Sequence, residues 1–272
     1  MPSAEEITQK AQSNLAFAFG CLPKEQKKDM VTFYAFCRVI DDLADDLNIS
    51  REERKNALKA WYEGIKSGFI KPDTLQREVS LLIDRYNISA QPFLELIDGC
   101  SSDLDPQRFH SWDDLSKYTY RVASCVGVIS THIFGCTHPD SHQYAITLGH
   151  ALQLTNIIRD VGEDLDNGKR IYLPLEDLHR FNYSEEDLVN RIYDERFTAM
   201  MHFQADRAEK LYTEATSYIQ PQDTKALQSA EAMRKIYHAL LQKMRKGNFQ
   251  VFQKRYSVSK IKKAALLLST RF

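Results

Sequence analysis

Side chains that carry oxygen recur every four residues in one stretch of the chain. Asn156, Asp160 and Asp164 stand among apolar neighbours such as Ile157 and Ile158. On a helix, side chains at this spacing share one face, about one turn apart. The apolar neighbours indicate a mostly buried helix, and buried carboxylates need a partner of opposite charge. We therefore expect these oxygens to hold a cation.

A second acidic cluster ends an earlier predicted helix. Asp41 and Asp45, with Asp42 and Asp46 beside them, oppose the helix macrodipole there, and such a local misfit is typical of a functional site. If this helix faces the Asn156 helix across a cavity, oxygen ligands from both walls suit a hard divalent cation. Magnesium fits best, because it keeps positions for water or for a substrate phosphate. No cysteine or histidine has the spacing of a zinc ligand.

Basic residues accompany both acidic clusters. Arg38 precedes the first cluster by about one turn, Arg159 lies within the second, and Lys169 and Arg170 follow it. A diphosphate group needs both a metal and guanidinium groups to neutralise its charge. One acidic pair alone is more often a solvated ion pair, but the coincidence of both clusters favours a diphosphate site. The Gly-rich phosphate loops GxxxxGK[ST] and GxGxxG are absent from the sequence.

The segments that carry these residues are predicted to be helices. Ten Gly and eight Pro are few for 272 residues, and no run alternates with period two, so we predict an all-α protein. No linker or repeat divides it, which favours one domain over residues 1–272. Helices are predicted over about residues 3–19, 24–47, 50–67, 92–101, 111–134, 140–165, 197–219 and 223–247, with further starts near 72 and 184.

The net charge and the cysteine content exclude several classes of protein. The 36 basic and 37 acidic residues give a net charge of −1, which supports neither a nucleic-acid binder nor an acidic tail. Five cysteines without a CxxC pair indicate reduced thiols and a cytoplasmic protein. The N-terminus lacks the pattern of a signal peptide, and no apolar run approaches the roughly 20 residues that span a bilayer. The basic, leucine-rich tail over residues 254–272 fits contact with an anionic membrane as well as a capping final helix.

Two segments resemble the signatures of a known family. Residues 34–45, YAFCRVIDDLAD, and residues 152–164, LQLTNIIRDVGED, resemble the signature segments of the squalene/phytoene synthases, the head-to-head prenyl transferases. Shorter matches at residues 118–127, 170–174 and 233–237 extend the resemblance over nearly the whole chain. It implies an isoprenoid-synthase-type helical bundle with a central apolar cavity, magnesium at its mouth and two prenyl diphosphates as substrates.

The resemblance also assigns residues to roles. The metal ligands it implies are Asp41, Asp45, Asn156, Asp160 and Asp164. The residues implied to hold the diphosphate or stabilise the leaving anion are Tyr34, Arg38, Gln153, Arg159 and Tyr172, with Tyr237 and Arg255 as further members. Val122, Ala123 and Gly127 are expected along the hydrocarbon channel. The catalytic set is thus Tyr34, Arg38, Asp41, Asp45, Asp160 and Asp164.

The chemistry implied by the resemblance is physically coherent. Ionisation of an allylic diphosphate leaves an anion, which metal and arginine stabilise, and a carbocation, which needs a dry aromatic pocket. Attack by the second allyl group then gives a cyclopropylcarbinyl diphosphate. The motifs are common to farnesyl and geranylgeranyl substrates and to squalene, hydroxysqualene, dehydrosqualene and phytoene as products. No dinucleotide fingerprint supports NADPH, although the fold could bind it without one.

One segment departs from the family pattern. Residues 11–15, AQSNL, replace a His-Ser-x-Ser-Phe-type segment that binds diphosphate, and Asn14 keeps one hydrogen-bond donor. An enzyme that acts only on the cyclopropyl intermediate, as in hydroxysqualene formation, would tolerate this change. The motifs are also compatible with a terpene cyclase or chain-elongating prenyl transferase on the same fold, and with a non-enzymatic helical assembly subunit in which they are vestigial.

Overall fold

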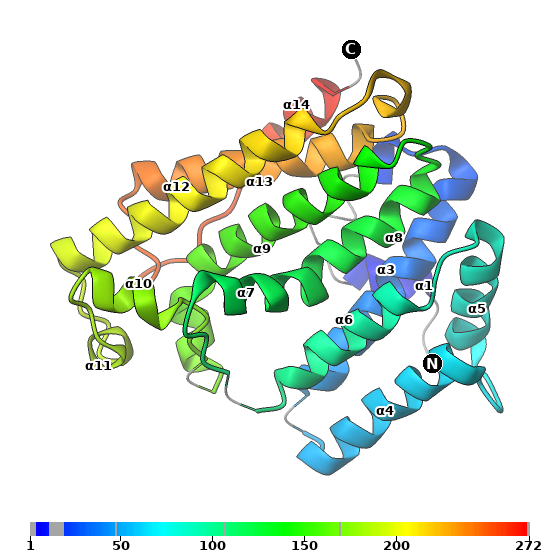
Figure 1. Ribbon diagram of the computed structural model, residues 1–272, viewed down its shortest axis with the longest axis horizontal. Coiled ribbons are helices and arrows are strands. Elements are labelled where there is room, and N and C mark those ends of the chain that lie inside the picture. The colour runs from blue at the N-terminus through cyan, green and yellow to red at the C-terminus, as the bar shows by residue number, and fades with distance from the viewer. Residues whose placement is uncertain (1–3, 11–18, 47, 106, 169, 271–272) are drawn as a thin grey trace.

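The protein is all-α, as predicted. A computed structural model describes residues 4–10, 19–46, 48–105, 107–168 and 170–270, and within these ranges the chain forms helices and no strand (Figure 1). The N-terminal elements are α1 (Ala4–Lys10), the 3-10 turn η1 (Phe19–Cys21), α3 (Lys24–Asp45), α4 (Arg51–Ser67), α5 (Thr74–Tyr86) and α6 (Gln91–Ser102). Of the helix predicted over residues 3–19, only its first part lies within the described residues.

An aromatic core holds the N-terminal helices together. Phe36 of α3 packs edge-on against Trp61 of α4, with ring centroids 5.4 Å apart, and Phe33 meets Phe93 of α6 at 5.8 Å. Burying rings of this size is a major source of stability. The predicted start of α4 is confirmed: Ser50 forms a capping box with the side chain three residues on.

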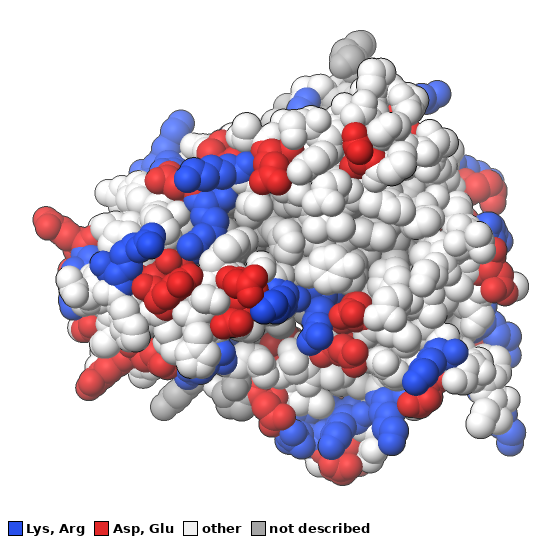
Figure 2. Space-filling view, viewed as in Figure 1, with Lys and Arg blue, Asp and Glu red and all other residues white. Residues whose placement is uncertain are grey.

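The long helix α9 is the centre of the C-terminal half. It packs against α8, α12, α13 and the π-helical turn η2. The bounds here are α7 (Trp112–Thr119), η2 (Tyr120–Ser124), α8 (Cys125–Phe134), α9 (Asp140–Asp166), α12 (Glu195–Ser217), η3 (Pro221–Asp223), α13 (Gln228–Lys246) and α14 (Lys260–Leu268). Residues 141–158 contain no Asp, Glu, Lys or Arg, and Figure 2 shows a broad uncharged area over α8 and α9, bordered by charged side chains.

Small residues let α9 approach its neighbours closely. A Cβ atom on Gly149 would lie 2.5 Å from the Cα of Ser124, and one on Gly127 would lie 2.9 Å from the carbonyl oxygen of Ala145. The helix predicted over residues 111–134 is divided at this contact by η2. Such π-helical turns are rare and are frequently found at functional sites.

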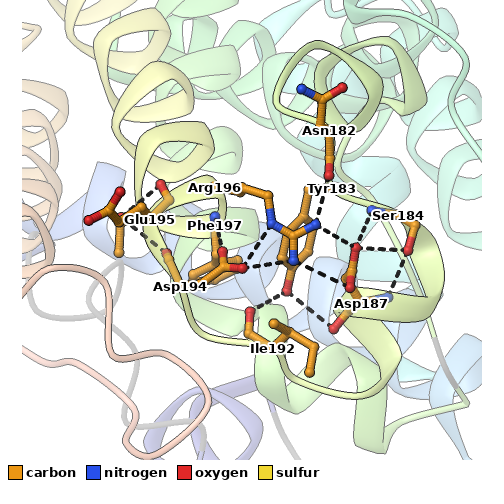
Figure 3. Close-up of polar contacts among 10 residues, drawn as sticks. Asn182, Tyr183, Ser184, Asp187, Ile192, Asp194, Glu195, Arg196 and Phe197 are labelled. Atoms are coloured by element: carbon orange, nitrogen blue, oxygen red, sulfur yellow. Dashed lines mark hydrogen bonds and ion pairs between the residues drawn. The ribbon is translucent and has the colours of Figure 1, made fainter.

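The connection between α9 and α12 is fixed by a polar cluster around Arg196 (Figure 3). The Arg196 guanidinium donates to the carbonyl of Asn182 at 2.9 Å and forms ion pairs with Asp194 at 2.7 Å and Asp187 at 3.2 Å. Its cation also lies over the ring of Tyr183. This connection contains two short helices that the sequence analysis placed only in part, α10 (Leu175–Arg180) and α11 (Glu185–Val189).

The cysteines that the structure describes form no disulfide bond. The thiols of Cys37, Cys100, Cys125 and Cys136 are free, as expected for reduced cysteines. No helix in the described ranges combines the length and the apolar character needed to cross a membrane.

Candidate active site

The two acidic clusters line one cavity. It lies between the C-terminal end of α3 and the second half of α9, and it has an empty volume of about 580 Å³ that is partly open to solvent. The predicted residues that line it are Asp41, Asp45, Gln153, Asn156, Asp160, Asp164 and Tyr172; Ala44, Cys100, Asp103, Tyr118, Ile157 and Arg170 complete the wall. Acids 115 or more residues apart in the sequence thus line one cavity, and α8, which packs against both α3 and α9, helps to hold the two acidic helices in place.

Arginines pair with most of these carboxylates. Arg38 donates to Asp41 at 2.7 Å and also contacts Asp42, so both partners lie on α3. Arg159 donates to Asp160 at 2.7 Å, and the side chains of both are mostly buried. The planar guanidinium group can form two parallel N–H···O hydrogen bonds to a carboxylate, and it binds a phosphate with the same geometry.

Two further arginines come from outside the two helices. Arg255, on the segment before α14, donates to Asp160 at 3.2 Å and forms an ion pair with Glu163 at 2.9 Å. Arg170, in the loop after α9, donates to Asp45 at 2.8 Å. Guanidinium groups thus pair with several of the carboxylates that line the cavity, and a diphosphate could recruit them.

Burial leaves several carboxyl groups weakly acidic. Desolvation, with the charge of Asp160 as the next cause, raises the pKa of Asp164 to about 7. Desolvation also raises the pKa of Asp41 to about 6, although Arg38 opposes the shift, and the pKa of Asp103 to about 6. Burial thus disfavours the charged form of these carboxyl groups, a penalty that a bound cation would relieve.

The donor set fits magnesium better than any softer metal. All the candidate ligands are carboxylate or amide oxygens, and the Oδ1 atom of Asn156, which lines the cavity, is buried without a hydrogen-bond partner. Asp164 accepts no side-chain hydrogen bond from the described residues. Within the described ranges no three acids already converge as a metal cluster, because the carboxylates of Asp41, Asp45 and Asp160 are turned to arginines instead.

Asp103 is a wall residue that the sequence analysis did not select. It accepts hydrogen bonds from the hydroxyls of Tyr118 at 2.8 Å and Tyr172 at 3.2 Å, and these two rings stack with centroids 5.3 Å apart. Asp103 is the C-cap of α6. An acid at a helix C-terminus was the same signal that pointed to Asp41 and Asp45.

A second, apolar cavity lies beside an earlier part of α9. Leu152 lines it, one residue before Gln153 of the acidic cavity, and its empty volume is about 550 Å³. Ala123 and Gly127, predicted along a hydrocarbon channel, line this cavity. Val122 lies on η2 and packs, partly buried, against the large core around α9. The other lining residues are Val126, Ser130, Thr131, Phe134, Tyr144, Ala145, Leu148, Gly149, Ser229, Ala230 and Met233.

Tyr34 and Tyr237 are predicted site residues that do not line either cavity. Tyr34 is buried in the core, where its ring meets Phe19 edge-on at 6.1 Å. Tyr237 lies on α13, partly buried, close enough to Arg159 to interact with its charge. Asn14, with the rest of residues 11–15, lies outside the described residues.

Comparisons with known proteins agree with this architecture. The family model described as squalene/phytoene synthase matches residues 8–262. The chain is 36% identical over 248 residues to a 15-cis-phytoene synthase of Synechococcus elongatus, which covers 86% of this chain and 80% of the relative. It is 34% identical over 244 residues to a presqualene diphosphate synthase of Zymomonas mobilis, covering 89% of this chain and 83% of the relative.

A solved structure shows the same fold. The crystal structure of a dehydrosqualene synthase in complex with ligand superposes with a TM-score of 0.85 at 30% identity, and the match covers 98% of this chain and 94% of the other. Family model, relatives and structure all cover most of the chain. The protein therefore belongs to the squalene/phytoene synthase family and is a prenyl transferase of the head-to-head type.

Proposed function

We propose that this protein is a magnesium-dependent enzyme that joins two prenyl diphosphates, farnesyl or geranylgeranyl, into a cyclopropylcarbinyl diphosphate and passes it on toward a squalene- or phytoene-type product. The observation that carries the proposal is the succession of two cavities along α9, one lined by acids and the next by apolar side chains. The relatives named phytoene synthase and presqualene diphosphate synthase support it.

The residues at the mouth would handle the diphosphate. Asp41, Asp45, Asn156, Asp160 and Asp164 would hold magnesium, which when bound neutralises the diphosphate and helps it to leave. The guanidiniums of Arg38, Arg159, Arg170 and Arg255, now paired with carboxylates, would turn to the phosphate oxygens as the metal takes those carboxylates. Gln153 and Tyr172 add neutral hydrogen-bond donors to the same wall.

The apolar cavity would protect the cation. Its lining contains no Asp, Glu, Lys or Arg, so a carbocation there would meet no charged nucleophile. Close backbone contacts of α9 with α8 at Gly127 and with η2 at Gly149 leave no space for water at these two points of the cavity wall. Both features let the second double bond, rather than water, reach the cation.

The test is diphosphate release by purified protein with each substrate and magnesium. Asp41→Ala and Asp160→Ala should each abolish release and leave the unfolding curve close to that of the wild type. Asp113→Ala removes an exposed acid of α7 that pairs with Lys117 and should release diphosphate normally. Retained turnover in either cavity variant would refute the proposed role of these acids.

Product analysis separates the competing enzymatic activities. A head-to-head enzyme gives a cyclopropylcarbinyl diphosphate or a product with twice the carbon number of its substrate. A terpene cyclase would give a product with one prenyl unit, and a chain-elongating enzyme a longer linear diphosphate. An enzyme specialised for the intermediate would release diphosphate only when that intermediate is supplied, which would contradict the condensation step.

A further inference from the structure

The outward face of α14 is apolar and open to solvent. Ile261 is 85% exposed and Leu268 is 54% exposed. They are seven residues apart, which places them on the same side of the helix, with the exposed Ala264 and Ala265 between them. These apolar side chains form one contiguous stripe that faces solvent and makes no core contact within the described ranges.

Positive charge flanks this stripe. Lys260 and Lys262 are exposed, and a helical rotation of about 100° per residue places them on its two sides. The last 41 residues, after Glu231, contain eleven Lys or Arg and no Asp or Glu, although the whole chain has a net charge of −1. The partner of this surface should therefore be negatively charged and apolar just beneath its charges.

The opposite face of α14 rests on the wall of the apolar cavity. Leu267 packs against Ala232 and Met233 of α13, and Met233 lines the cavity. Both ends of α14 are fixed: Ser259 caps its start, and Lys235 of α13 donates to the carbonyl of Ser269 at 2.9 Å. The helix is thus held at the edge of the bundle beside α13 (Figure 1).

We propose that α14 docks the protein on the surface of an anionic phospholipid bilayer. Ile261 and Leu268 enter the interface, while Lys260 and Lys262 extend to the lipid phosphates. A second copy of this chain fits the surface less well, because the stripe is small for a stable dimer and lysines on both flanks would repel their equivalents. If the proposed function holds, docking also places the wall of the apolar cavity beside the phase that dissolves a hydrocarbon product.

Vesicle sedimentation with the full chain tests this proposal. The protein should bind vesicles of equal parts phosphatidylcholine and phosphatidylglycerol, bind phosphatidylcholine alone much more weakly, and lose affinity as salt rises. The double variants Ile261→Glu with Leu268→Glu and Lys260→Gln with Lys262→Gln should each weaken binding by about tenfold or more. The matched control is Ile70→Glu with Leu81→Glu, which changes exposed apolar residues elsewhere and should bind as the wild type does.

Two outcomes would overturn the proposal. One is equal vesicle binding by the wild type and the Ile261, Leu268 variant. The other is a dimer in sedimentation velocity that this variant dissolves, which would assign the face to a second copy of the chain. The vesicle assay contains no substrate, and turnover of a soluble diphosphate is measured separately, so loss of activity and loss of docking are distinguished.

Discussion

Arg170, in the loop that follows α9, donates a hydrogen bond to Asp45 at the end of α3, with 2.8 Å between nitrogen and oxygen. The two acidic clusters are therefore joined across the mouth of the cavity by a side chain as well as by helix packing. Asp103 contributes to the same junction, because its backbone carbonyl lies 3.5 Å from the Arg170 guanidinium. The guanidinium group of Arg170, which follows α9, thus contacts the C-terminal ends of both α3 and α6.

Replacing Arg170 should impair diphosphate turnover more than folding. Arg170→Gln removes a donor that would face the leaving diphosphate, and loss of one such donor typically lowers kcat by about a hundredfold. Arg170→Lys keeps the charge without the planar fork and should recover part of the loss. Steady-state diphosphate release measures the effect, and urea unfolding serves as the control. Wild-type kcat in the glutamine variant would show that Arg170 only ties the helices together.

The raised pKa of Asp164 should make the stability of the metal-free protein fall as pH rises through the range from about 5 to about 7, above the range in which the lowered pKa of Asp223 acts in the opposite direction. The pKa of Asp164 is raised from 3.8 to about 7, chiefly by burial, so the folded state holds this proton more tightly than the unfolded chain. The resulting stabilisation is complete below about pH 4 and is lost as pH rises through about 7. Asp41 and Asp103, with pKa values of about 6, act in the same direction.

Urea unfolding in a chelator at several pH values measures this dependence. Asp164→Asn should flatten it, because the amide has no proton to lose. Magnesium replaces protons at the carboxylates, so its stabilising effect should be larger above pH 7 than below pH 6. A magnesium effect independent of pH would argue against metal ligation by the carboxyl groups whose pKa is raised.

The sequence predicted what is local in the chain, and it missed what depends on tertiary packing. The start of the helix predicted over residues 50–67 and the repeats of four that contain Asp41 and Asp160 are local features, so spacing alone revealed them. Asp103, at the C-terminus of α6, has the same helix-end signal as Asp41, but its place in the site depends on the packing of α6 against α3, which spacing does not show. The π-helical turn η2 also depends on a neighbour, since α9 meets it at Gly149.

Gly149→Ala should destabilise the fold without touching the acidic cavity. The added Cβ would lie 2.5 Å from the Cα of Ser124, a backbone atom that cannot rotate away. Overpacking of this kind costs about 1–3 kcal/mol in the free energy of unfolding, which urea denaturation can resolve. Gly20→Ala is the control, because its Cβ would have its nearest contact at an ordinary 3.7 Å. Equal stability of the two variants would mean that α9 and η2 can separate at little cost.

Tyr144 should limit the length of the prenyl chain that the apolar cavity accepts. It lines that cavity and is fully buried. It precedes Gln153 by nine residues of α9, about 13 Å along the helix axis, so it lies far from the acidic cavity. Its hydroxyl donates to Glu231 at 2.8 Å, and Arg234 holds Glu231 in turn at 2.8 Å, which prevents the ring from swinging aside.

Shortening this side chain should therefore shift substrate preference. Tyr144→Val removes the ring while Arg234 still neutralises Glu231, and it should raise kcat/KM for geranylgeranyl over farnesyl diphosphate by about tenfold, the scale of discrimination that an apolar pocket achieves. Tyr144→Phe keeps the ring and should leave the ratio near that of the wild type. Competition between the two diphosphates, read by mass spectrometry of the products, gives the ratio directly. An unchanged ratio in a folded Tyr144→Val protein would place the end of the channel at another residue, and the ring of Phe134, which lines the same cavity, would be the next to shorten.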